Sequence, residues 1–186
     1  MNNPKQKYLD NYIHDFCKTL TKVKSQKKEI EDIFKTLLIY NKKKTVHVFG
    51  NGGSASIASH FSMDLTNNSK IKCLSYNDPS IITCYANDFK FENWISKAIQ
   101  KYGNKNDLLI LISSSGKSKN MLNAVKAAKN KKFYKIITFT GFNYKNPLMR
   151  KGNLNIWINS KNYNIVENAH QFFLLFLVDM IKKFVK

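Results

Sequence analysis

The segment TVHVFGNGGSAS, residues 45–56, carries the clearest fold signal in this chain of 186 residues. Residues 45–49 form a short run rich in β-branched side chains, which indicates a strand. Glycines follow within residues 50–53 and allow the backbone to turn sharply. A helical stretch near residues 54–66 comes next. A strand, a glycine-rich turn and a helix in this order predict an α/β fold with a parallel sheet.

The same alternation continues along the chain. Four further apolar runs read as strands, at residues 71–74, 108–112, 136–139 and 154–158. Helical patterns lie near residues 91–102, 119–130 and, weakly, 146–151. The sequence therefore predicts one domain over residues 1–186, with a doubly wound, five-stranded parallel sheet flanked by helices.

Two helical regions flank this core. Apolar side chains recur at helical spacing over residues 9–38, so we expect an N-terminal helical arm (1–42) before the α/β core (43–186). The last helix, about residues 165–184, is apolar nearly all round from Phe172 to Val178. Such a surface is buried in a core or against another subunit, which predicts an obligate oligomer.

Composition and charge narrow the classes of function. The chain has 31 basic and 12 acidic residues, a formal net charge of +19, with Arg150 as the only arginine. Scattered lysines with a single arginine are not typical of a specific nucleic-acid reader, so we expect no nucleic-acid partner. AT-rich codon usage is the simpler explanation, although the charge would also attract anionic substrates. No apolar segment reaches membrane-spanning length and no secretory signal is visible, so we expect a cytoplasmic location.

Two loops carry groups suited to anion binding. The glycine loop, residues 50–54, opens a helix whose first N–H groups are unpaired and attract anions. Its glycines partly match a dinucleotide-binding pattern, but no acidic residue ends the second strand, so we expect no nucleotide cofactor. The serine loop, Ser113–Ser118, follows the third strand in the same way. Because both loops lie at the carboxyl edge of the sheet, they favour a phosphorylated ligand.

Two pairs of titratable residues share helix faces. His60 and Asp64 are four residues apart, and Glu167 and His170 are three apart. Together the four could form a metal site or an acid–base pair for proton transfer next to a carbonyl. The residues alone leave both possibilities open.

Five segments together resemble the sugar isomerase (SIS) domain, most closely the bacterial phosphoheptose isomerases. They are VFGNGGSASIASHFSMDL (48–65), ITCYANDF (82–89), LLILISSSGKSKN (108–120), IITFTG (136–141) and IVENAHQ (165–171). The resemblance implies a homotetramer with sites between subunits. It also implies conversion of sedoheptulose 7-phosphate to D-glycero-D-manno-heptose 7-phosphate for lipopolysaccharide or capsule biosynthesis.

The resemblance also assigns expected roles to single residues. The substrate-binding positions fall on Asn51, Gly52, Gly53, Ser54, Asn87, Asp88, Ser113, Ser114, Ser115 and Ser118. The family's zinc-binding His falls on His60, its catalytic Glu on Asp64, its Gln on Glu167 and its catalytic His on Leu175. The metal set would be His60, Asp64 and Glu167, holding zinc.

The leading hypothesis is therefore a ketose–aldose isomerase in which Asp64 transfers the proton through an enediol. His170 or Glu167 would supply the second group in place of the missing His. On an ideal helix, however, His170 and position 175 lie on different sides of Glu167. The alternative is a non-catalytic SIS protein, either a phosphosugar binder or a protein-binding tetramer of the kind that associates with replication initiators.

Overall fold

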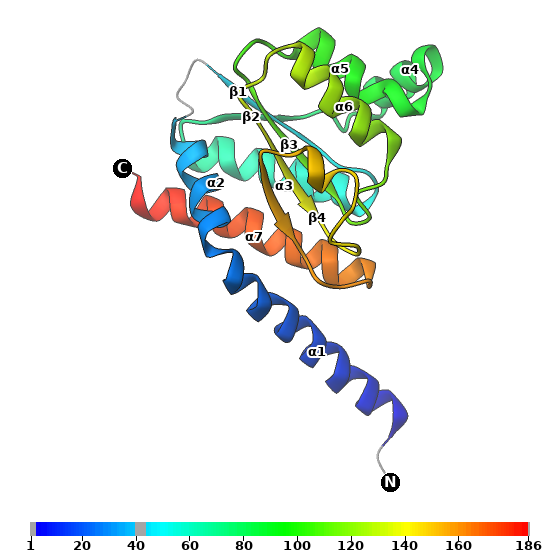
Figure 1. Ribbon diagram of the computed structural model, residues 1–186, viewed down its shortest axis with the longest axis vertical. Helices are drawn as coiled ribbons and strands as arrows, with labels where there is room; N and C mark the ends of the chain where they lie inside the picture. The colour runs from blue at the N-terminus through cyan, green and yellow to red at the C-terminus, as the bar shows by residue number, and fades with distance from the viewer. Residues whose placement is uncertain (1–2, 40–43, 186) are drawn as a thin grey trace.

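Five parallel strands form the sheet of the computed structural model, which describes residues 3–39 and 44–185 (Figure 1). The strands are β1 (Thr45–Phe49), β2 (Lys72–Ser75), β3 (Leu108–Ser113), β4 (Lys135–Thr140) and β5 (Leu154–Trp157). Their order in the sheet is β2-β1-β3-β4-β5, and every pair is parallel. The prediction of a five-stranded parallel sheet is confirmed, with each strand within one residue of its expected bounds.

Helices cover both faces of the sheet (Figure 1). One face packs against α2 (Lys27–Ile39), α3 (Gly53–Asn68) and α7 (Tyr163–Phe184), and the other against α5 (Trp94–Tyr102) and α6 (Lys119–Asn130). All six residues of β3 are buried because this central strand is covered on both faces. This double cover makes the strand an uninterrupted apolar run in the sequence.

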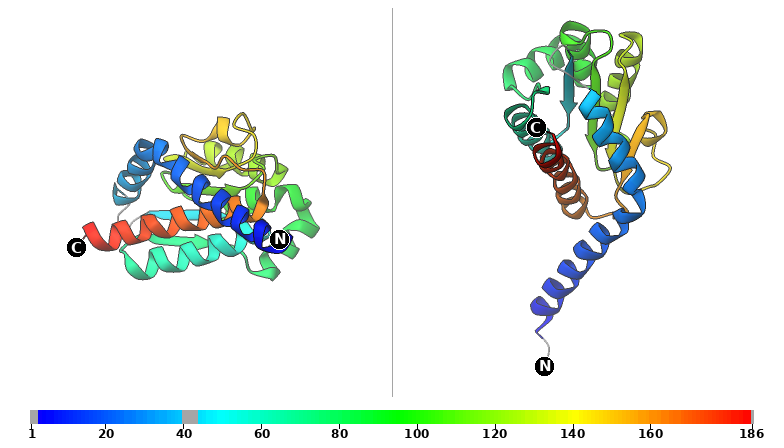
Figure 2. Two further views of the ribbon diagram at one scale, coloured as in Figure 1. Left: turned by 90° about the horizontal axis from the view of Figure 1, so that it is seen from below. Right: turned by 90° about the vertical axis from the view of Figure 1, so that its left-hand side faces the viewer.

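The N-terminal arm consists of two helices with different surroundings. In Figure 2, α1 (Pro4–Lys22) extends away from the body, and Thr19 is its one buried residue. A short 3₁₀ turn, Val23–Gln26, then leads into α2. The Gln26 side chain accepts a hydrogen bond from Trp157 N (2.9 Å) and donates one to Trp157 O (2.8 Å). These two bonds join the arm to β5, the strand at the edge of the sheet, because they pair the backbone groups of Trp157. The predicted boundary between arm and core, at residues 42 and 43, lies outside the described residues.

The structure corrects two sequence expectations for helices. Residues 79–89 form a helix, α4 (Pro79–Phe89), although the sequence signal there was read only as a motif. None of its residues is fully buried, and Ile81, Ile82 and Tyr85 pack against the core only in part. The weak helix expected at 146–151 is only a 3₁₀ turn, Met149–Lys151. In the part of the chain that the structure describes, no helix has the length and apolarity needed to cross a membrane.

A buried polar network fastens the amino edge of the sheet. Asp107, just before β3, accepts hydrogen bonds from Thr45 N (3.1 Å) and Asn104 N (2.8 Å). His47 on β1 lies 2.9 Å from Asp107 through Nε2, and its Nδ1 lies 2.9 Å from the Tyr76 hydroxyl. Burial lowers the pKa of His47, so the neutral ring donates to Asp107 and accepts from Tyr76. Asp107 and Thr45 lie at the amino edge of the sheet, opposite the glycine and serine loops, and Tyr76 joins the network from the end of β2.

Candidate active site

The glycine loop and the serine loop meet at the carboxyl ends of neighbouring strands. β1 ends at Phe49, which pairs with Leu111 in β3, so the loops that follow are adjacent. A pocket of about 100 Å³ lies where they meet the start of α7. It is lined by Asn51, Ser54, Ile112, Ser113, Ser114, Ser115, Ser118, Tyr163 and Glu167. The structure therefore brings together seven of the polar residues that the sequence singled out.

The glycine loop places Glu167 against the first turn of α3. Gly52 has a φ of 55°, which only glycine adopts without strain, and its carbonyl accepts from Ala55 N at 2.9 Å. A Cβ on Gly53 would lie 2.3 Å from Glu167 Oε2, so only glycine lets the carboxylate approach this closely. Ser54 Oγ donates to Glu167 Oε1 at 3.4 Å. Glu167 thus lies at the N-terminus of α3, where the helix dipole favours a negative charge.

The serine loop offers hydroxyl groups to the same pocket. Ser114 is 5% exposed, and its Oγ has no hydrogen-bond partner among the described residues. Ser118 begins α6, yet its hydroxyl does not cap the helix. The buried, unpaired hydroxyl of Ser114 requires a partner, and a ligand oxygen would provide one.

A second polar group lies farther along the contact between α3 and α7. His60 Nε2 is 3.3 Å from Asp64 Oδ2, and its Nδ1 is 3.4 Å from Gln171 Nε2. The side chains of His60 and Asp64 are 43% and 28% exposed. We call this contact between α3 and α7 the seam. Ser54 and Glu167 meet at its inner end, next to the serine loop. His60, Asp64 and Gln171 meet farther along it, away from the serine loop.

The residues of the predicted zinc set do not meet at one point within a single chain. Within residues 3–39 and 44–185, no three His, Cys, Asp or Glu side chains are grouped closely enough to hold a metal ion. His60 and Asp64 pair with each other, whereas Glu167 contacts Ser54 at the inner end of the seam. A zinc site needs at least three protein ligands around one point. The expected metal role of these residues is not supported within one chain.

His170 does not lie in the site, contrary to the expectation that it could transfer a proton. Its ring is fully buried, Nε2 donates to Thr140 O at 3.1 Å, and the ring packs edge-on against Phe139. The reason is the helical phase, which turns His170 toward the sheet while Glu167 faces the pocket. Position 175, where the resemblance places the catalytic His, holds a half-buried leucine on α7.

Burial of His170 gives a testable dependence of stability on pH. Burial lowers its pKa from 6.5 to about 4, so the unfolded chain binds a proton between these values and the folded chain does not. Stability should fall as the pH drops from 6.5 toward 4, by up to about 3 kcal/mol from this group. Urea denaturation at pH 7 and pH 5 should show a smaller difference for His170→Gln than for the wild type. His14→Gln, at an exposed position, should leave the difference unchanged; an unchanged difference in His170→Gln would contradict the assignment.

Asn87 and Asp88 lie on exposed α4, outside the pocket. Asn87 Nδ2 donates to Asp88 Oδ1 at 3.1 Å, and neither residue lines the pocket of its own chain. Their expected contact with a sugar is therefore not made within one chain.

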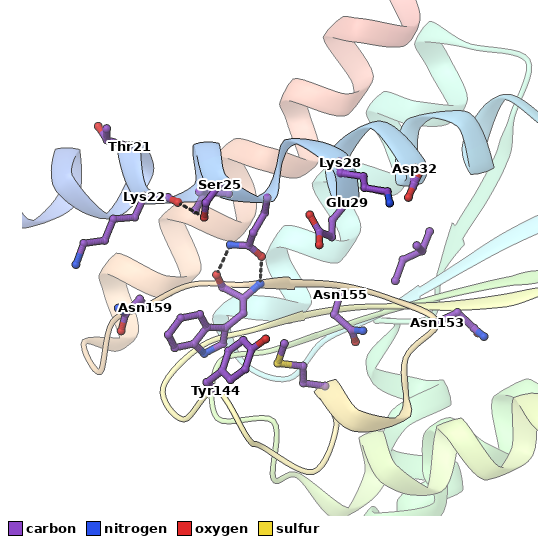
Figure 3. A pocket seen from close by; sticks show the side chains of 15 residues that line it. Thr21, Lys22, Ser25, Lys28, Glu29, Asp32, Tyr144, Asn153, Asn155 and Asn159 are labelled. Carbon is purple, nitrogen blue, oxygen red and sulfur yellow. Dashed lines mark hydrogen bonds between the residues drawn. The ribbon is translucent and has the colours of Figure 1, made fainter.

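A larger cavity lies away from this site (Figure 3). It measures about 1040 Å³ and lies between the arm and β5, with Gln26, Tyr144 and Trp157 among its lining residues. It includes none of the residues that the sequence predicted for binding or catalysis.

Three residues of the site were not predicted from sequence. Tyr163 lines the pocket, Gln171 contacts His60, and Asn120 pairs with Asn51. Asn120 and Gln171 lie within the segments that carried the resemblance, but only the folded chain shows what each one contacts.

The chain is similar to known proteins in sequence and in fold. A family model described as the SIS domain matches residues 11–141. The phosphoheptose isomerase of Buchnera aphidicola (subsp. Acyrthosiphon pisum, strain Tuc7) is 36% identical over 150 residues, 76% of this chain and 72% of that protein. That of Cytophaga hutchinsonii is 43% identical over 97 residues, 50% of each protein. The chain thus spans about half the length of this second relative.

The fold is also that of a solved relative. The structure of a phosphoheptose isomerase from Francisella tularensis superposes with a TM-score of 0.85. It covers 97% of this chain and 100% of that one, at 24% identity.

Proposed function

Because this chain belongs to the SIS domain family and its relatives include phosphoheptose isomerases, we propose that it is a phosphosugar ketose–aldose isomerase. The proposed reaction converts sedoheptulose 7-phosphate to D-glycero-D-manno-heptose 7-phosphate, in the cytoplasm, for surface polysaccharide. The observation that carries the proposal is the pocket itself, where hydroxyls of the serine loop and the start of α3 meet a carboxylate.

The serine loop would hold the phosphate group. Its hydroxyls and the N–H groups at the start of α6 can donate hydrogen bonds to a phosphate without a metal ion. Ser114 Oγ is already buried and has no hydrogen-bond partner among the described residues. The rest of the open-chain sugar would extend along the seam between α3 and α7. Asn51 and Ser54 would then contact the sugar from the glycine loop.

The proton transfer would use the carboxylates of this seam. Asp64 would take a proton from C1 while the C2 carbonyl oxygen receives one, which gives an enediol. Return of a proton to C2 and loss of the O1 proton would leave an aldehyde at C1. We assign the second proton-transferring role, in place of His170, to Glu167, the carboxylate that lines the pocket. Within one chain Glu167 contacts Ser54 at the inner end of the seam, apart from Asp64, so the assignment requires that Glu167 and Asp64 meet across a subunit contact.

Loss of a serine hydroxyl should weaken binding of phosphorylated sugars specifically. Ser115→Ala or Ser118→Ala removes one donor from a charge-assisted set, which costs roughly 1.5–3 kcal/mol, or about ten- to a hundred-fold in affinity. Calorimetric titration with sedoheptulose 7-phosphate and with sedoheptulose would measure this. Ser25→Ala, on the arm and outside the pocket, is the control. Equal losses for both sugars would show that the loop does not bind the phosphate.

We further propose that the working unit is an oligomer, most simply a tetramer. Pockets that enclose small molecules usually measure about 300–1,000 Å³, so 100 Å³ in one chain is too small for a heptose phosphate. Apolar side chains are also exposed on α1 (Tyr8, Leu9, Ile13) and on α7 (Phe172, Phe176). Such surfaces are typical of subunit contacts.

Light scattering at micromolar concentration should therefore give a mass well above 21.6 kDa. Phe172→Ser with Phe176→Ser should lower that mass, because a large apolar contact is lost. Exposed Tyr134→Ser, on neither surface, is the matched control. A monomeric mass for the wild type would contradict the proposal.

The direct test of function is an isomerase assay with sedoheptulose 7-phosphate, with and without added zinc. One observation favours the non-catalytic alternative, namely that Leu175 occupies the family's catalytic His position and His170 is buried in the core. Tight phosphosugar binding without turnover would support a sensor or protein-binding role.

A further inference from the structure

We propose that Asn120 is a positioning residue that fixes the glycine loop relative to the serine loop, so that both face one phosphosugar. This inference rests on the proposed function, because it concerns how the same site is held ready for its ligand. The residue was not among the expected site residues, and it does not line the pocket.

The two amide side chains form a reciprocal pair. Asn51 Nδ2 donates to Asn120 Oδ1 at 3.1 Å, and Asn120 Nδ2 donates to Asn51 Oδ1 at 2.9 Å. Two parallel bonds between planar amides fix orientation as well as distance. Asn120 Oδ1 also accepts from Met121 N at 3.0 Å, which ties the pair to the first turn of α6.

The position of Asn120 explains why it can act in this way. It is 2% exposed and lies two residues after Ser118, so its amide has little freedom to turn. Asn51 is half-buried and lines the pocket, and its amide keeps one N–H and one lone pair beyond the pair with Asn120. Asn120 therefore holds a ligand-facing residue without touching the ligand.

The pair joins the glycine loop to the serine loop, which the sheet does not connect beyond the ends of β1 and β3. The glycine loop leaves β1 after Phe49, and the serine loop leaves β3 after Ser113. Each loop has its own internal bonds, Ser54 N to Asn51 O and Gly116 N to Ser113 O, both 3.1 Å. A site that binds one ligand with two loops needs their separation fixed beforehand, since misplacement of about 1 Å is costly to both binding and rate.

Asn120→Ala tests the inference against a matched control. Asn123→Ala lies on the same helix and removes an amide that makes two bonds, to Glu92 O (2.9 Å) and Asn93 Oδ1 (3.0 Å), away from the pocket. We expect Asn120→Ala to weaken binding of sedoheptulose 7-phosphate about tenfold, as the loss of two neutral hydrogen bonds predicts. Asn123→Ala should leave affinity unchanged even if it lowers the melting temperature. In a double-mutant cycle, Asn51→Ala should cost less affinity in the Asn120→Ala background than in the wild type, because only the contact of Asn51 with the sugar is then left to lose.

A ligand-free measurement separates this inference from the proposed function. Hydrogen exchange at the amides of Ser54 and Gly116 should be about tenfold faster in Asn120→Ala than in the wild type or in Asn123→Ala. If the wild type fails to bind the sugar phosphate but these amides still respond, the proposed substrate is wrong and the positioning role stands. Unchanged exchange at both amides overturns the role of Asn120, as does unchanged affinity when the wild type binds. Asn120→Asp, which keeps the size of the side chain and one bond, should give an intermediate result if the packing is preserved.

Discussion

Asp64→Asn is expected to reduce isomerase turnover by about 10²- to 10⁴-fold, the range for loss of one general acid–base group. The amide keeps the size of the carboxylate and can still contact His60, but it cannot accept a proton. Because Asp64 lies outside the pocket that holds the serine loop, affinity for the sugar phosphate should change little. Steady-state rates and calorimetric binding, measured on the same preparation, would separate the two effects.

Two variants give this prediction its controls. Asp179→Asn changes an exposed carboxylate on α7 and should leave turnover unchanged. Leu175→His restores an imidazole one turn beyond Gln171, which contacts His60, and so beside the turn of α3 that carries Asp64. If the natural chain is a weakened isomerase, this variant should be faster by a similar factor. Full activity in Asp64→Asn would rule out Asp64 as the base.

Asp107→Leu is expected to lower the free energy of unfolding by roughly 3–5 kcal/mol. The substitution leaves His47 Nε2 without its acceptor in the buried interior, and it removes the acceptor shared by Thr45 N and Asn104 N nearer the surface. Unpaired buried donors carry their full desolvation cost. Chemical denaturation followed by circular dichroism would measure the loss.

Tyr76→Phe tests a smaller part of the same network. It removes only the hydroxyl that lies 2.9 Å from His47 Nδ1 and keeps the ring stacked on Phe49, so we expect a loss of about 1 kcal/mol. Because the network lies at the amino edge of the sheet, neither variant should alter sugar-phosphate affinity at a temperature where the chain stays folded. A loss in Asp107→Leu no larger than that in Tyr76→Phe would show that the carboxylate is not the centre of the network.

The sequence alone predicted the layout of the sheet and where its ligand loops lie. β3 is buried on both faces, so its six residues form a continuous apolar signal, and the glycine and serine loops follow β1 and β3 directly. Such local patterns need no knowledge of distant contacts. Helix α4 was not predicted, although Ile81, Ile82 and Tyr85 give it an apolar face that packs, partly buried, against the core.

Tertiary structure decided which of the candidate residues share a site. Spacing placed Glu167 and His170 on one stretch of α7, but packing against the sheet turns His170 onto Thr140 while Glu167 faces Gly53. The pairing of Asn51 with Asn120 joins residues 69 positions apart, and no local pattern encodes it. Sequence periodicity reports which residues share a helix face; only the packing of α3, α6 and α7 around the ends of the strands determines which faces meet.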